Sequence, residues 1–294
     1  MQLTTNDLLQ LSQLAIIAAK RAGRVVAQKS HSPLTVLKKK GGDQRASQVV
    51  TEVDYLSQAA ILEVLLPSCE RYDLALLTEE AVDDKLRLER DYFWSIDPLD
   101  GTLPFTESTP GYAVSIALVS RLGEPLIGVV YDPVEDRLYT AVKGQGACRN
   151  GQPWLLPPTC IMKGKRLTLI CDRSLTQQTH YPKMLKTVKA MAAEQGLLGL
   201  TIIHQGGAVM NACWVIEQAP ALYFKPPKSQ EGGGSLWDFA ATACLFNELA
   251  APVSDIYNQP LDLNRADSTF MNHRGVIFAS APFWQRRVSS LINL

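Results

Sequence analysis

The sequence predicts a protein of mixed α+β and α/β class, with an antiparallel sheet in its N-terminal half and a mixed α/β arrangement in its C-terminal half. Three observations support this class: two helical stretches come first, strand-like segments joined by tight turns follow, and strands then alternate with helices. The chain has 294 residues, about twice a typical domain. We therefore expect an N-terminal subdomain over residues 1–157 and a C-terminal subdomain over residues 158–294.

Both N-terminal helices are predicted from the spacing of apolar residues. Leucines, isoleucines and valines recur at helical intervals over residues 7–28, with Thr5 or Asn6 available as a cap. A second helix is expected over residues 55–66, closed by Pro67.

The segment between these helices, residues 38–47, is basic and broken by glycines, which is typical of an exposed loop. Lys40 either approaches a substrate from this loop or belongs to an exposed run of charge.

The next elements are strands, and short turns between them predict an antiparallel meander. The segments expected to form it are residues 93–96, 112–120, 126–132 and 137–142. Beyond the two prolines at 157 and 158 the pattern alternates, which favours helices covering a sheet. Strands are expected at residues 166–171, 201–204, 221–225 and 276–279, and helices at 183–193, 208–218, 237–250 and 283–292.

Composition limits the classes of function. The 29 basic residues balance the 29 acidic ones, so bulk charge gives no argument for a nucleic-acid polymer or an anionic membrane as a partner. No apolar run approaches the ~18 to 20 residues of a membrane span. The N-terminus lacks a positive-then-apolar signal pattern, and we expect a cytoplasmic protein.

Cysteine and histidine do not form a metal-binding pattern in this sequence. The six cysteines are scattered without a C-x-x-C pair, and we expect buried, reduced thiols. The four histidines also lack metal-ligand spacing, so zinc is not expected. Carboxylate oxygens would have to hold any metal, which favours Mg²⁺.

The carboxylates Asp97 and Asp100 lie in the segment Trp94-Ser-Ile-Asp-Pro-Leu-Asp-Gly-Thr102. Asp followed by Pro is typical of a type I turn, which would bring the two Cα atoms within ~7 Å of each other. The two carboxylates and the Leu99 carbonyl would then converge, and two anions held together favour a cation between them or a shared proton. An ordinary solvated turn is the alternative interpretation.

Gly101 and Thr102 follow directly. A glycine permits close approach of the backbone, and N–H groups at this point could bind a phosphate. The threonine hydroxyl could hydrogen-bond a metal-bound water.

Three further acidic positions have structural alternatives. Glu79, with Glu80 beside it, follows the apolar run at 74–77 and could open a loop or a helix. Asp54 follows Thr51 by three residues, and Asp238 follows Ser235 by three, so each fits a capping box. Capping fixes the direction of a carboxylate and is therefore compatible with metal binding.

A phosphatase of the haloacid-dehalogenase type is a competing interpretation. Its nucleophilic motif is Asp-x-Asp-x-Thr, whereas Asp97 and Asp100 are three residues apart. This spacing places the second acid wrongly for protonation of a leaving group.

Four motifs in order resemble the inositol monophosphatase family, which consists of magnesium-dependent, lithium-sensitive phosphomonoesterases and includes 3′(2′),5′-bisphosphate nucleotidases. They are Thr51-Glu-Val-Asp54, Glu79-Glu80, Asp97-Pro-Leu-Asp-Gly-Thr102 and Trp237-Asp-Phe-Ala-Ala241. The resemblance implies a layered α-β-α-β-α sandwich, a homodimer, and two or three Mg²⁺ ions.

The resemblance also implies the metal ligands. Glu79 and the Leu99 carbonyl would bind a first ion, Asp97 would bridge two ions, and Asp100 and Asp238 would hold the second. Most of these ligands belong to the N-terminal subdomain, and Asp238 belongs to the C-terminal one.

Catalytic and substrate roles follow from the same resemblance. Thr102, paired with Glu79, would orient the attacking water, with Asp54 behind this pair. The amides of Gly101 and Thr102 would contact the phosphate. The substrate-contacting turn would be formed by Gly206, Gly207 and Ala208.

Lys225 stands where the family pattern has an acid for sugar hydroxyls. A lysine suits a second phosphate on the substrate, although residues 225–234 could also be a solvated loop. We therefore favour 3′-phosphoadenosine 5′-phosphate as the substrate. The alternatives are an inositol monophosphate, a sugar bisphosphate, or a non-catalytic protein that binds a phosphorylated metabolite.

Overall fold

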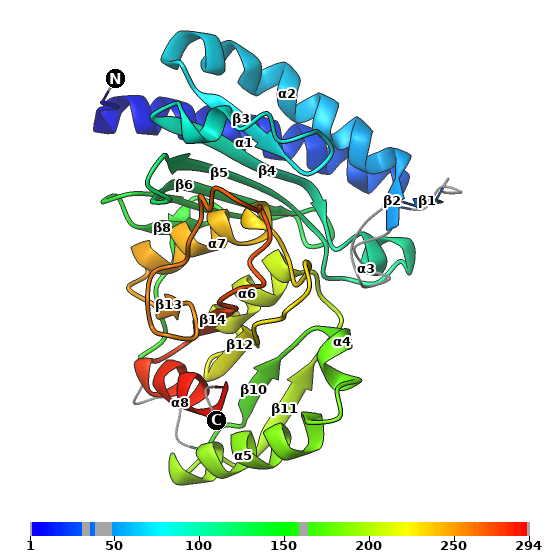
Figure 1. Cartoon of the computed structure of the whole chain (residues 1–294), viewed down its shortest axis with the longest axis vertical. Coiled ribbons are helices and arrows are strands. Elements are labelled where there is room, and N and C mark those ends of the chain that lie inside the picture. The colour runs from blue at the N-terminus through cyan, green and yellow to red at the C-terminus, as the bar shows by residue number, and fades with distance from the viewer. Residues whose placement is uncertain (1, 31–35, 39–48, 159–163, 293–294) are drawn as a thin grey trace.

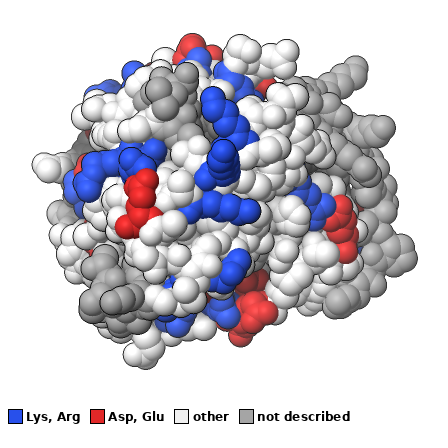
Figure 2. All heavy atoms as spheres, turned by 90° about the horizontal axis from the view of Figure 1, so that it is seen from below, with Lys and Arg blue, Asp and Glu red and all other residues white. Residues whose placement is uncertain are grey.

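Helices and sheets alternate in five layers through the molecule (Figure 1). The computed structural model describes residues 2–30, 36–38, 49–158 and 164–292. The first layer consists of α1 (Thr5–Lys29) and α2 (Glu52–Tyr72). These two helices cover a seven-stranded sheet, and α6 (Ala208–Glu217) and α7 (Leu236–Glu248) separate it from a five-stranded sheet (Figure 1). Helices α5 (Tyr181–Glu194) and α8 (Pro282–Ile292) cover the far side, the face toward the viewer in Figure 2. This order confirms the expected α-β-α-β-α sandwich.

The seven-stranded sheet is the predicted meander with additions at both ends. Its order is β3-β4-β5-β6-β7-β8-β9, antiparallel except for the parallel pair β3 and β4. Its strands are β3 (Ala75–Thr78), β4 (Tyr92–Asp100), β5 (Ala113–Ser120), β6 (Pro125–Asp132), β7 (Arg137–Val142), β8 (Ala147–Arg149) and β9 (Gln152–Pro153). Short helices η2 (Leu86–Leu88) and α3 (Thr102–Thr106) flank β4.

The five-stranded sheet is mixed, in the order β11-β10-β12-β14-β13. Strand β10 is parallel to both β11 and β12, whereas β14 is antiparallel to β12 and β13. The strands are β10 (Leu167–Ile170), β11 (Leu200–Ile203), β12 (Ala221–Lys225), β13 (Val253–Ser254) and β14 (Val276–Ala279). The helices of this half are α4 (Arg173–Thr176), α5 (Tyr181–Glu194), α6 (Ala208–Glu217), α7 (Leu236–Glu248) and α8 (Pro282–Ile292).

The first helices differ from the prediction at their ends. Thr4, not Thr5 or Asn6, caps α1, through a capping box with Asp7. Helix α2 continues through Pro67 to Tyr72, so the expected stop is wrong. Ser68 and Tyr72 beyond the proline are buried, and Tyr72 belongs to the apolar cluster that also contains residues of α1. Tertiary packing therefore outweighs the local penalty of the proline.

The loop expected at residues 38–47 falls mostly outside the described residues, and so does Lys40. Lys38 ends a short strand, β1 (Val36–Lys38), which pairs antiparallel with β2 (Val49–Thr51).

The type I turn expected at Asp97–Asp100 is wrong, because β4 continues to Asp100. Asp97 pairs with Ser115 and Asp100 with Ala113, so β4 has one more residue than β5 between these pairs. This extra residue is a β-bulge. In a regular strand, residues three apart point to opposite faces. The bulge corrects this phase, so both carboxylates lie on the same side.

Apolar residues fill the spaces between the layers in three main clusters. One packs α1 and α2 on the first sheet, one surrounds α6 and α7 between the sheets, and one lies beneath α5 and α8. The described cysteines are free thiols, and three of them, Cys171, Cys213 and Cys244, are buried. No described helix is both long and apolar enough to cross a membrane.

Candidate metal centre

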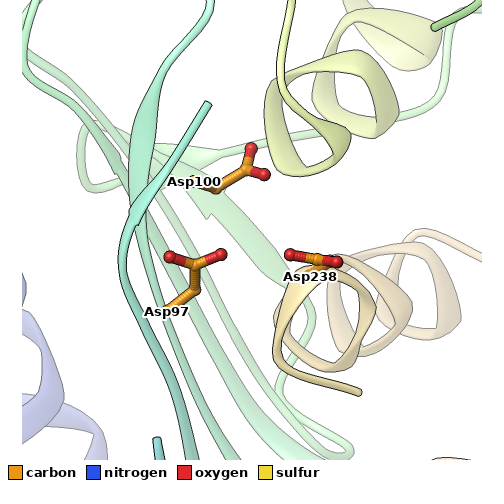
Figure 3. A group of neighbouring side chains, drawn as sticks. All are labelled: Asp97, Asp100 and Asp238. Carbon is orange, nitrogen blue, oxygen red and sulfur yellow. The ribbon is translucent and has the colours of Figure 1, made fainter. Parts of the chain in front are cut away.

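Three carboxylates meet where the first sheet faces the middle helices. Asp97 and Asp100 end β4, and Asp238 lies in the first turn of α7. One oxygen of each carboxylate lies within 4.8 Å of the other two. Figure 3 shows the three side chains turned toward a common space. All three residues were predicted from the sequence.

The direction of Asp238 is set by the start of α7. Its carboxylate accepts a hydrogen bond from the Ser235 N–H at 2.6 Å, within the predicted capping box. Gly234 precedes this cap with φ of +98°, and a Cβ there would lie 2.7 Å from Asp238 Oδ2. The capping and metal-binding interpretations are therefore compatible in this structure.

Asp100 is tied to the start of α6. Its two carboxylate oxygens accept hydrogen bonds from the backbone N–H groups of Ala208 at 3.1 Å and Val209 at 2.9 Å. Gly207 allows this approach, because a Cβ there would lie 2.3 Å from Asp100 Oδ2. The predicted substrate turn thus contacts the acidic group directly.

Burial and mutual repulsion raise the pKa values of these acids. Burial raises the pKa of Asp97 well above its usual range, and the charges of Glu79 and Asp100 raise it further. Burial also raises the pKa of Asp100, with a further contribution from Asp238. The acids would thus repel one another when ionised. A buried set of carboxylate oxygens is the type of donor set that suits Mg²⁺, so these residues fit the implied metal.

Glu79 lies in the turn after β3, and its N–H donates to the Ile96 carbonyl at 3.2 Å. Its half-buried side chain is not in the group of three carboxylates. Its charge nevertheless raises the pKa of Asp97, which places it on the Asp97 side of the centre.

The hydroxyl of Thr102 connects two further predicted residues. Thr102 Oγ1 lies 3.3 Å from Asp54 Oδ1 and 3.3 Å from the Leu99 carbonyl oxygen. Asp54 is 1% exposed and lies in the first turn of α2. The structure therefore brings Thr102 into direct contact with Asp54, which was expected to lie behind a pair formed by Thr102 and Glu79.

Lys225 lies at the end of β12, beside a cavity of about 360 Å³. Its Nζ is 3.0 Å from Asp172 Oδ2, and 5.3 Å from the centre of the Phe239 ring. Burial lowers the pKa of Lys225, but Asp172 and Asp238 have the larger effect and raise it overall. The lysine is thus a charged group between the cavity and the acidic centre.

The partners of Lys225 were not predicted from the sequence. Asp172 also accepts hydrogen bonds from the Tyr223 hydroxyl at 3.1 Å and from Asn211 Nδ2 at 3.4 Å. One signal was present in the sequence. Asp172 and Lys225 stand at the carboxyl ends of two predicted strands, and ligands bind at that edge when such strands are parallel.

The sequence and the fold of this chain are similar to those of known proteins. A model of the inositol monophosphatase family matches residues 7–291. The Nus factor SuhB of Salmonella typhimurium is 37% identical over 243 residues, which cover 82% of this chain and 84% of the relative. A staphylococcal inositol monophosphatase-1, solved as a LiCl-soaked inhibitory complex, has a TM-score of 0.75 at 20% identity and covers 100% of this chain and 97% of its own. An IMPase/NADP phosphatase solved with NADP and Ca²⁺ has a TM-score of 0.73 at 19% identity, with 98% and 96% coverage.

Proposed function

This chain belongs to the inositol monophosphatase family, and we propose that it hydrolyses a phosphate monoester of a small metabolite in a Mg²⁺-dependent reaction. The convergence of Asp97, Asp100 and Asp238 is the observation that carries the proposal. Together with Glu79 these are four carboxylates, and their four negative charges would be balanced by two Mg²⁺ ions. A phosphate dianion would be repelled by the bare carboxylates, so neutralisation is also a condition for substrate binding.

The residues of the chain hold and orient the reacting groups. Asp97 would bridge two ions, with Glu79 and the Leu99 carbonyl on one side and Asp100 and Asp238 on the other. Bound Mg²⁺ would supply the Lewis acid that activates water and stabilises the leaving oxygen.

Water positioning falls to Thr102 in this proposal. Its hydroxyl lies within hydrogen-bond distance of Asp54, and when it donates there, the lone pairs of its oxygen stay available to accept a hydrogen bond from the attacking water. The amides of Gly101 and Thr102 would bind the phosphate. Catalysis would thus depend on positioning and electrostatics, as in phosphoryl transfer generally.

Substitution of the bridging acid tests the reaction class. Asp97→Asn keeps the shape of the side chain but removes its charge, and we expect phosphate release to fall at least about 100-fold, since even partners of metal ligands contribute 10–100-fold. Asp73→Asn is the matched control, because Asp73 is exposed and pairs with Arg90 on the surface. Circular dichroism would check the fold. Full activity of the folded Asp97→Asn protein would refute the proposal.

The substrate we favour carries a second anionic group, as 3′-phosphoadenosine 5′-phosphate does. Lys225 supports this, because it is a charged group that faces both the cavity and the acids. The cavity is also lined by Lys228 and His180, whereas Asp172 is the single acidic residue in its lining. The similarity in fold to a phosphatase solved with NADP is consistent with a nucleotide. Inositol monophosphates and sugar bisphosphates are the alternatives.

A pair of substrates isolates the role of Lys225. Lys225→Met removes the charge while keeping an unbranched side chain of similar length. We expect kcat/KM for 3′-phosphoadenosine 5′-phosphate to fall about 10- to 100-fold, since a hydrogen bond to a charged group contributes ~1.5–3 kcal/mol. Adenosine 3′-monophosphate lacks only the second phosphate and should be little affected. Lys189→Met, at an exposed site on α5, is the control.

Equal losses for both substrates would contradict the assignment of Lys225 to a second phosphate. Activity confined to inositol 1-phosphate or fructose 1,6-bisphosphate in the same assay would move the substrate to one of the alternatives, with the reaction class unchanged.

A further inference from the structure

Residues 264–271, which we call the strap, connect two parts of the chain that carry predicted metal ligands. At one end the strap is bonded to the segment that follows Glu79, and at the other end it pairs with the residues that precede Asp238. We propose that the strap is a positioning element that sets the Asp238 carboxylate in register with the Glu79 side of the centre, with Asn264 as its anchoring residue. The proposal rests on the Mg²⁺ binding proposed above.

The first anchor is the side chain of Asn264. Its Oδ1 accepts a hydrogen bond from Arg87 Nη1 at 2.6 Å. Its Nδ2 donates to the Arg87 carbonyl at 3.0 Å and to the Arg121 carbonyl at 2.8 Å. The oxygen and the nitrogen of this one amide are therefore both bonded, to η2 and to the loop after β5. Bonds at both atoms fix the position and the orientation of the Asn264 side chain.

Arg87 makes this anchor rigid. Its side chain is 0% exposed, and its Nη1 also donates to the Arg265 carbonyl at 2.9 Å. Its guanidinium forms an ion pair with Asp83 at 2.9 Å. Asp83 lies four residues beyond Glu79, in the connection that leads from β3 to η2. A fully buried arginine with these partners cannot shift without breaking several bonds.

The second anchor is a short antiparallel pairing with the start of α7. The Leu236 N–H donates to the Thr269 carbonyl at 2.9 Å, and the Met271 N–H donates to the Gly234 carbonyl at 2.9 Å. Phe270 of the strap is therefore paired with Ser235 as an isolated bridge. Ser235 is the N-cap whose N–H bonds the Asp238 carboxylate.

Internal bonds stiffen the strap between its anchors. Arg265 pairs with Asp267 at 2.5 Å, and its Nη1 donates to the Phe270 carbonyl at 3.3 Å. The Phe270 N–H donates to Ser268 Oγ at 3.1 Å. A stiff segment can transmit the position of η2 to Ser235. Displacement of Ser235 would move Asp238, because the Ser235 N–H is bonded to its carboxylate at 2.6 Å.

Magnesium affinity separates positioning from simple stabilisation. In Asn264→Ala both ends of the anchoring amide are lost, and we expect the dissociation constant for Mg²⁺ alone, measured by titration calorimetry on the full chain, to rise about tenfold, as for partners of metal ligands generally. The matched control is Asn150→Ala. Asn150 Oδ1 also accepts a hydrogen bond, from the Leu138 N–H at 2.7 Å, but Asn150 lies directly after β8 in the first sheet.

We expect both variants to melt at lower temperature, and only Asn264→Ala to lose Mg²⁺ affinity. An Mg²⁺ dissociation constant within twofold of wild type in folded Asn264→Ala would overturn the proposal, and so would equal losses in both variants. Wild-type protein that binds no Mg²⁺ would instead overturn the proposed function itself.

A milder variant tests the same proposal if the Asn264→Ala protein does not fold. Lys85 is half exposed, and its Nζ donates to the Ala266 carbonyl of the strap at 3.3 Å. For Lys85→Ala we expect a rise of about twofold in the Mg²⁺ dissociation constant, in line with the small energies of exposed contacts. An unchanged constant would count against the strap as a positioning element.

Discussion

Gly207 is a residue at which a single added carbon would disturb the candidate site. A Cβ there would lie 2.3 Å from Asp100 Oδ2 and 2.7 Å from the Gly101 Cα. Neither neighbour can easily give way, since Asp100 is held by two N–H groups of α6 and Gly101 belongs to the backbone after β4. The close approach of α6 to β4 therefore requires a glycine at this position.

Gly207→Ala should consequently lower both stability and activity. Overpacking of this kind costs about 1–3 kcal/mol of folding free energy. We also expect weaker Mg²⁺ binding, because Asp100 must move. Denaturant unfolding and the Mg²⁺ dependence of phosphate release measure the two effects. Gly144→Ala is the control for Mg²⁺ binding, since its Cβ meets nothing within 4 Å and its φ of +75° makes an alanine cost stability without contact with the site. Wild-type values for both measurements in Gly207→Ala would contradict the packing.

The three clustered acids could be predicted from the sequence, whereas Asp172 was not. Asp97 and Asp100 lie close in the chain, so a local pattern brings them together. The local pattern at Asp238 predicts a cap, and its metal role came from the family resemblance. The pairing of Asp172 with Lys225 depends on which strands become neighbours in the sheet. No local pattern contains that information.

The bounds of strands and helices with strong periodicity were predicted to within a few residues. The strand at 137–142 and the strand at 221–225 have the observed bounds. The errors lie where tertiary contacts outweigh local preference. Helix α2 passes Pro67 because Ser68 and Tyr72 are buried on its inner face, with Tyr72 in the cluster that packs α1 and α2 on the first sheet. The Asp-Pro pattern alone suggested a turn at Asp97–Asp100. The structure has a β-bulge there, because β4 pairs with β5 on both sides of it.

Helix starts supply much of the geometry of the candidate site. The first amides of α6 hold Asp100, and the cap of α7 holds Asp238. Asp54 lies in the first turn of α2 and meets Thr102, which opens α3. Such positions have fixed backbone directions, and polar groups placed there are held without long flexible side chains.

The candidate site lies between the first sheet, the middle helices and the second sheet. Strand β4 of the first sheet contributes two acids, α7 of the middle layer contributes the third, and β12 of the second sheet contributes Lys225. A substrate bound here would contact both halves of the chain. The subdomain boundary near Pro157 and the homodimer implied by the family resemblance stay predictions.

A crystal structure of the protein grown with saturating Mg²⁺ would show whether these carboxylates hold a metal ion. We predict electron density for a metal ion coordinated by oxygens of Asp97, Asp100 and Asp238 at about 2.0–2.1 Å, the distance that Mg²⁺ requires. Carboxylates that stay apart in those crystals, with water alone between them, would contradict the account of this protein as a magnesium-dependent phosphatase.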